Sequence, residues 1–154
     1  MNKEVIGIKS KKYINLSIVS VILMILLLMI SLAVYIDSEN IFLMFVFILL
    51  LIPFIFILIS FIKSILNKKV LVEKDNYGIY LNYIKRTIYI KNKDIENVYS
   101  YKVRYRYGWY PFGHLYIVTK DKKYKIGVID EVEEVVKELK KVYEYKFKII
   151  SNYK

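Results

Sequence analysis

The chain has no cysteine, and between Tyr13 and Ile62 it has no lysine, arginine or histidine. The absence of cysteine excludes disulfides, thiolate metal sites and cysteine nucleophiles. So long a stretch without basic residues is typical of a segment that enters a membrane. Only Asp37 and Glu39 carry charge within it, and they lie near its middle. The sequence therefore predicts two membrane-spanning helices joined by a short polar turn.

The two apolar runs are residues 16–36 and 41–62, and residues 37–40 form the turn between them. A helix rises about 1.5 Å per residue, so each run is roughly 30 Å long and matches the hydrocarbon core of a bilayer. Neither run carries the polar stripe of a helix in a soluble protein. A signal peptide would have a shorter apolar core of about 7–15 residues. We therefore expect both runs to remain in the mature protein.

Basic residues flank the two runs and are absent from the turn. Because lysine and arginine near span ends mark the cytoplasmic side, both termini are predicted in the cytoplasm and the turn outside. This predicts a two-span, multi-pass protein of the cell membrane, with a basic N-terminus (residues 1–15) and a basic juxtamembrane linker (residues 63–69). The residues that determine this topology are Lys9, Lys11, Lys12, Lys63, Lys68 and Lys69.

Neither predicted span contains an ionisable residue or a glycine. A pore, a pump or a proton relay usually needs charged groups within the membrane, and close helix packing of the GxxxG type needs glycine. Pro53 allows a kink in the second span, but its neighbours are apolar. The spans are therefore predicted to act as an anchor, and the function is expected in the part that follows.

Residues 70–145 change to short alternating runs separated by turn signals, which predicts one α+β domain followed by a basic tail, residues 146–154. A helix should begin at Asp130, which is a good N-cap, and bury a stripe of valine and leucine. For the tail, three interpretations are open: it extends this helix, it adds a strand, or it contacts the membrane. The predicted strands are residues 70–74, 79–84, 87–91, 98–107, 114–120 and 123–128.

This order resembles the bacterial pleckstrin-homology-like (PH-like) domains of the DUF304 type. The resemblance runs from Val72 to Val142, and the implied fold is an antiparallel barrel or bent sheet closed by the C-terminal helix. The β-turn at residues 75–78 has an acidic residue and no lysine or arginine, which disfavours headgroup binding there. The matching features are Gly78-Ile79-Tyr80, Ile95 with Val98, the Gly-x-Leu-x-Ile-x-Thr pattern from Gly113 to Thr119, and Ile129 before the capped helix.

Two groups of residues are candidate contacts for anionic lipid or a partner. Lys102, Arg104 and Arg106 alternate along one predicted strand face, which suits contact with anionic lipid. The alternative interpretation is an ordinary solvated strand face without a binding role. Trp109, Tyr110 and Phe112 fall in a predicted aromatic turn at residues 108–113, which either enters the headgroup layer or folds back to cap the barrel.

The soluble part carries 21 basic and 11 acidic residues from residue 63 onward, a net charge of +10. This charge indicates attraction to anionic partners, although a compositional bias towards lysine explains it equally well. The single histidine, His114, has no partner pattern for catalysis or metal binding, so we expect no enzymatic activity and no cofactor. Nucleic acid is disfavoured because no binding motif occurs.

The predicted function is a membrane-anchored binding, scaffold or accessory protein on the cytoplasmic face. It would contact membrane lipids and bind a protein partner or a second copy of itself. The alternative is immunity or resistance to membrane-active peptides, because small two-span proteins with this type of domain resemble factors encoded beside leaderless bacteriocins.

Overall fold

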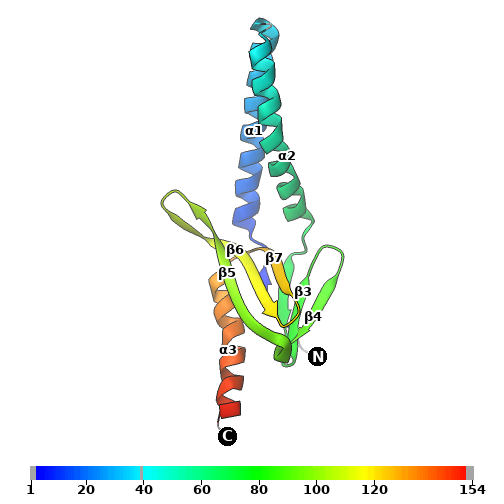
Figure 1. Ribbon diagram of the computed structural model, residues 1–154, viewed down its shortest axis with the longest axis vertical. Coiled ribbons are helices and arrows are strands. Elements are labelled where there is room, and N and C mark those ends of the chain that lie inside the picture. The colour runs from blue at the N-terminus through cyan, green and yellow to red at the C-terminus, as the bar shows by residue number, and fades with distance from the viewer. Residues whose placement is uncertain (1–2, 39, 152–154) are drawn as a thin grey trace. The chain divides into compact units, whose positions relative to one another are not determined.

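The fold is that of a computed structural model, which describes residues 3–38 and 40–151, with side chains described as far as Lys141. The chain divides into two compact units. One is the helical segment Lys12–Leu66. The other, which contains the part predicted to be soluble and is called the soluble unit below, combines Met1–Lys11 and Asn67–Lys154. The predicted α+β class, with two long apolar helices followed by antiparallel strands and a C-terminal helix, is confirmed (Figure 1).

The helical unit contains α1 (Lys11–Ser38) and α2 (Ile41–Leu66). Both are long and apolar enough to cross a membrane, by length and composition. The Asn40 side chain caps α2 by accepting a 2.9 Å hydrogen bond from the Phe42 amide. The hydroxyls of Ser17, Ser20 and Ser38 in α1 donate to carbonyl groups one turn earlier, which satisfies them in an apolar environment. The buried Ser31 hydroxyl forms no hydrogen bond with the described residues.

The first sheet, sheet A, contains β1 (Glu4–Ile8), β2 (Val70–Lys74), β3 (Gly78–Asn82) and β4 (Thr87–Lys91), in that order. All neighbouring pairs are antiparallel. Strand β1 precedes the helices in the chain and β2 follows them. Ile8 lies opposite Val70, and the Lys9 amide donates to the Lys69 carbonyl at 2.9 Å. The segment 1–15, for which the sequence predicts no element, therefore supplies a strand to the domain.

The second sheet, sheet B, contains β5 (Ile95–Tyr105), β6 (Gly108–Thr119) and β7 (Lys123–Ile129). A 3-10 turn, η1 (Asn92–Asp94), separates β4 from β5. The buried Asn92 bonds the carbonyl groups of Asn76 and Tyr77, which keeps it with sheet A while β5 begins a new sheet. Within the described residues, an isolated bridge between Lys9 and Ile129 joins the two sheets. Of the two expected forms, an antiparallel barrel or a bent sheet, a closed barrel does not occur among the described residues, whose strands form a four-stranded and a three-stranded antiparallel sheet.

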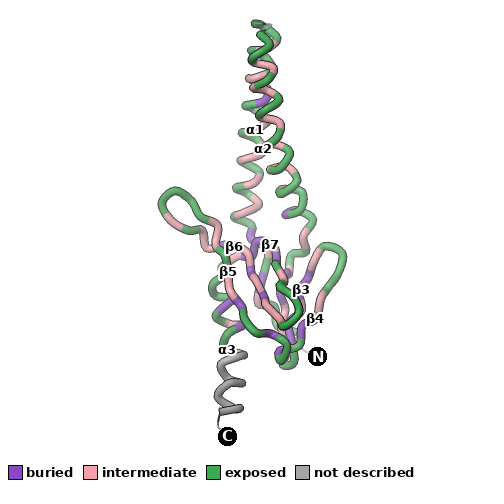
Figure 2. Tube along the Cα trace, in the orientation of Figure 1, coloured by how far each residue is buried: buried purple, intermediate pink, exposed green. Residues whose placement is uncertain are grey.

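Helix α3 (Val132–Ser151) packs against β5, β6 and β1. Its predicted apolar stripe is buried from Val132 to Leu139, in one core with residues of both sheets (Figure 2). The predicted members Val142 and Tyr143 lie outside the described side chains. The helix begins at Val132, later than predicted. Glu131, between Asp130 and the helix, has a positive φ of 44°, which is not a right-handed helical conformation. The backbone of the tail continues α3 as far as Ser151, and residues 152–154 lie outside the described residues.

Candidate binding surface of sheet B

The aromatic residues expected in a turn lie in a strand instead. Strand β5 ends at Tyr105, the chain turns over two residues, and β6 begins at Gly108, directly opposite Tyr105. The predicted aromatic turn at residues 108–113 is therefore wrong. The Tyr105 ring of β5 and the Tyr110 ring of β6 pack across the two strands at 4.8 Å, and Tyr110 also stacks on Phe112 of its own strand at 4.7 Å.

The end of the β5–β6 hairpin, residues 103–111, projects from the rest of sheet B, and we call it the arm (Figure 1). Phe112 is buried at its base, which agrees with the expectation that this ring folds back. Trp109 is 52% exposed and Tyr107 80% exposed, so these two rings do not cap the core. Tyr110 is half-buried between its aromatic neighbours. The arm thus presents large rings to its surroundings.

The three basic residues expected on one face have different surroundings. Lys102 forms a 2.8 Å ion pair with Glu133 of α3, so it faces the helix. The Arg104 guanidinium lies 5.6 Å from the Trp109 ring, and that of Arg106, in the turn, lies 5.4 Å from the Tyr107 ring. These are cation–π distances. The arm therefore combines two arginines with two exposed rings, and Lys102 is separate from them.

The exposed face of sheet B carries a second group that the sequence analysis missed. The Tyr99 and Tyr116 rings stack at 5.2 Å, and the Lys123 ammonium lies 5.2 and 4.7 Å from their centres. We call this group the tyrosine–lysine face. Its members, on alternate positions of β5, β6 and β7, are Tyr99, Tyr101, His114, Tyr116, Lys123 and Lys125.

The alternation of tyrosine and lysine was visible in the sequence, but it did not show which strand face α3 covers. Tyrosine suits a buried and an exposed face equally well. The register settles the matter, because Val98, Leu115 and Ile126 point into the core and their neighbours point outwards. The outward face thus contains the tyrosines, and not the expected row of Lys102, Arg104 and Arg106.

The arm and the tyrosine–lysine face carry positive charge without acidic residues. No aspartate or glutamate occurs between Asn97 and Lys120, or in β7. A hydrogen bond with Tyr99 raises the pKa of Lys123, so its charge is secure at neutral pH. Burial, and then the nearby Lys125, lower the pKa of His114, so the neutral imidazole dominates there. The surface charge therefore comes from lysine and arginine alone.

The lysines predicted to determine topology fall in both units. Lys11 and Lys12 begin α1, and Lys63 lies in the last turn of α2. Lys9, Lys68 and Lys69 belong to the soluble unit and bond there. The Lys9 ammonium donates to the Asn67 carbonyl at 2.9 Å, the Lys68 ammonium to the Thr87 hydroxyl at 3.4 Å, and the Lys69 carbonyl accepts from the Lys9 amide.

The β2–β3 turn is organised by the Asp75 carboxylate. It accepts hydrogen bonds from the amides of Tyr77 and Gly78, at 2.8 and 2.7 Å, and from the Tyr80 hydroxyl at 2.8 Å. Desolvation raises the pKa of Asp75, but these hydrogen bonds outweigh it and the net shift is downward. The same contact raises the pKa of Tyr80 to about 12. The Asp75 carboxylate thus stabilises the β2–β3 turn through these hydrogen bonds.

Replacing Asp75 by asparagine is expected to make the soluble unit less stable in a pH-dependent way. Because the folded-state pKa lies below the ordinary 3.8, the carboxylate stabilises the fold above pH 3.8, and this stabilisation is lost as the pH falls through the folded-state value. The difference in urea midpoint between the wild type and Asp75→Asn should be largest at pH 7 and shrink in acid. Tyr80→Phe should give a smaller loss, and a pH-independent difference would contradict this account.

The geometry of sheet B suits contact with a flat or extended anionic surface. Its positive groups and rings lie on one strand face and on one arm. Compared with models of known families, with curated proteins and with solved structures, the chain gives no match.

Proposed function

We propose that this chain is a membrane-anchored, non-enzymatic binding protein with a PH-like soluble unit on the cytoplasmic face. In this proposal, the arm and the tyrosine–lysine face contact anionic lipid headgroups. The observation that carries the proposal is the convergence of exposed tyrosine and tryptophan with lysine and arginine on one sheet. No acidic residue interrupts the strands that form it between Asn97 and Lys120.

Both residue types favour the boundary between membrane and water. Tyrosine and tryptophan concentrate at the headgroup level because their rings are apolar and their polar groups stay hydrated. A basic side chain near an anionic leaflet contributes about 1 kcal/mol. Two apolar helices would keep the soluble unit close to that leaflet, so even a weak contact would be populated.

The topology supports the placement of the soluble unit. Strand β1 precedes α1, and β2 follows α2, yet they are neighbours in sheet A. If the two helices span a membrane, pairing of β1 with β2 requires both flanking segments on the same side. Lysines before and after the helices favour the cytoplasmic side. Two antiparallel sheets and a C-terminal helix also agree with the PH-like arrangement implied by the sequence resemblance.

The single tryptophan of the chain, Trp109, allows a direct test. In nanodiscs, its emission should shift to the blue, and be quenched by brominated lipid, when anionic lipid is present and not with neutral lipid alone. Arg104→Glu with Arg106→Glu should remove this difference. Two basic residues near the surface contribute about 2 kcal/mol, so the lipid-bound population of the arm should fall more than tenfold.

Lys91→Glu with Lys93→Glu is the matched control, because it changes the net charge equally at exposed positions outside sheet B. It should leave the Trp109 response intact. The lipid proposal is wrong if Trp109 responds equally in neutral and anionic discs. Cross-linking in native membranes would then test the scaffold role by capture of a protein partner or a second copy. The protective role against membrane-active peptides stays a prediction.

A further inference from the structure

A second candidate surface lies between β1 and α3, and it shares no residue with sheet B. A groove of about 380 Å³ separates the edge of sheet A from the first turns of the helix. Strand β1 is the edge strand, and β2 is its neighbour on the inner side. At one end, the Ile8 carbonyl accepts from the Asp130 amide, which closes the groove there.

The groove contains a strand edge and uncovered apolar side chains. From Glu4 to Ile6, β1 has no strand neighbour on its outer side within the described residues. Val5 and Ile8 line the groove and are 48% and 46% exposed. Unpaired strand edges bind extended peptides by adding a strand, whose backbone forms the hydrogen bonds and whose alternate side chains enter neighbouring pockets.

The lining of the groove is acidic, although the chain as a whole has a net charge of +11. Glutamates in the first turn of a helix interact favourably with the helix dipole. Glu4 belongs to β1 and Glu138 to a later turn of α3, so the dipole does not explain why all the acidic residues gather here. Among the residues that the structure describes, no lysine or arginine lines the groove. The carboxylates that do are Glu4, Asp130, Glu131, Glu134 and Glu138.

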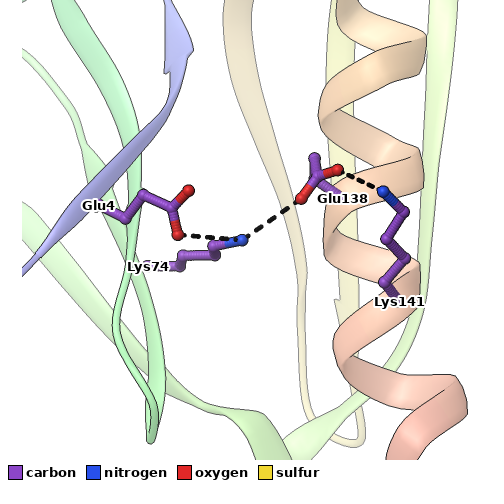
Figure 3. A network of polar contacts seen from close by, with 4 residues as sticks. All are labelled: Glu4, Lys74, Glu138 and Lys141. Carbon is purple, nitrogen blue, oxygen red and sulfur yellow. Dashed lines mark hydrogen bonds and ion pairs between the residues drawn. The ribbon is translucent and has the colours of Figure 1, made fainter.

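Lysines neutralise only part of this charge. Lys74 lies between Glu4 and Glu138, at 3.2 and 3.5 Å, and Lys141 is 2.7 Å from Glu138 (Figure 3). With Glu131 left aside, two lysines against the four carboxylates of Glu4, Asp130, Glu134 and Glu138 leave an excess of two negative charges. Within the described residues, no three acidic or histidine side chains are grouped to hold a metal ion. The charge therefore favours an extended, positively charged ligand.

We propose that this groove binds a short basic peptide segment of a protein partner, which adds to β1 as a strand. The open edge of β1 from Glu4 to Ile6 can pair with about three residues of the peptide, at about 3.3 Å per residue, and the residues that flank them follow the groove. Apolar side chains on one face of the peptide would cover Val5 and Ile8, and lysine or arginine would meet Glu134. A second copy pairing β1 with β1 would bring like charges together, so charge disfavours it.

The test uses the full chain in detergent micelles and a fluorescent hexapeptide of alternating lysine and valine. It should bind, and an alternating glutamate–valine peptide should not. Glu134→Lys should weaken binding at least about tenfold. Glu96→Lys, an equal charge change on an exposed residue of β5, should not. If Glu134→Lys lowers the unfolding midpoint, Glu134→Gln replaces it and should weaken binding less.

A basic peptide with proline at alternate positions distinguishes strand addition from simple charge attraction, because proline has no amide donor. Equal binding of the proline peptide would overturn strand addition. Equal binding of the acidic peptide, or no binding of the lysine–valine peptide at millimolar concentration, would overturn the site. A dimer that light scattering detects and that Glu134→Lys dissociates would also overturn the proposal, because a second copy would then occupy the groove. None of these results depends on the response of Trp109 to lipid.

Discussion

Replacing Gly113 by alanine is expected to destabilise the soluble unit by about 3 kcal/mol, because no space exists for a methyl group at this position. A Cβ atom there would lie 2.4 Å from the Tyr101 carbonyl oxygen and 2.8 Å from the Lys102 Cα. Both are backbone atoms of the neighbouring strand, so no side chain can move aside. The strands β5 and β6 would have to separate where the arm begins.

Gly127→Ala is the matched control in the adjacent strand. A Cβ atom there would meet the end of the Asn67 side chain at 3.0 Å, and that amide can rotate away. Thermal unfolding in detergent micelles, followed by Trp109 fluorescence, should show a large decrease in midpoint for Gly113→Ala and a small one for Gly127→Ala. Equal midpoints for the two variants would contradict the steric argument. A loss of about 3 kcal/mol is substantial for a unit of ordinary stability.

The helices were the part of this fold that the sequence predicted best. A run of more than twenty apolar residues has few alternatives to a membrane helix, so residues 16–36 and 41–62 indicated α1 and α2 directly. The structure extends both helices, because α1 begins at Lys11 and α2 ends at Leu66. The basic and polar residues at these ends are helical although they lie outside the apolar runs, so a hydropathy pattern does not detect them.

The strands were predicted where alternation was clear and missed where pairing partners are distant in sequence. Residues 70–74 and 87–91 agree with β2 and β4. Strand β1 is five residues long and includes Gly7, so its local pattern is weak. What makes it a strand is β2, which lies more than sixty residues later in the chain. Pairing at such a separation has no local signal.

The candidate site was predicted in composition but not in geometry. Arg104 and Trp109 were recognised as candidates, yet their pairing across the arm depends on a two-residue turn that the sequence analysis placed later. Lys102 was assigned to the same exposed row, and its partner Glu133 lies in a helix about thirty residues away. Which face α3 covers is decided by packing of the whole core, and no window of a few residues contains that information.

Removing β1 is expected to unfold most of the soluble unit, whereas removing the helices between β1 and β2 is not. Gly7 packs closely against Val72 and Ile129, because a Cβ atom added at Gly7 would lie 3.1 Å from one side chain and 3.5 Å from the other. Both side chains are fully buried. Exposing two such side chains costs about 4 kcal/mol. A chain of residues 69–151 should therefore show no cooperative unfolding, and its open β2 edge should favour aggregation.

Joining residues 3–9 to residues 69–151 with a short glycine–serine linker should restore the fold. The Lys9 amide already lies 2.9 Å from the Lys69 carbonyl, so a few residues suffice to replace the helical hairpin. In this fusion, Gly7→Leu should abolish cooperative unfolding as β1 deletion does, because a larger side chain has no space beside Val72. Val5→Thr, at a 48% exposed position of the same strand, should change stability by less than about 0.5 kcal/mol.

Circular dichroism during thermal unfolding distinguishes these variants. If residues 69–151 alone unfold cooperatively at the same temperature as the fusion, β1 is dispensable and the topological argument fails. If only the fusion folds, the segments on both sides of the helical hairpin must meet before sheet A is complete. A chain whose α1 and α2 did not return to the same side of a membrane could not satisfy that requirement. Pairing of β1 with β2 would then select the two-span topology independently of the flanking lysines.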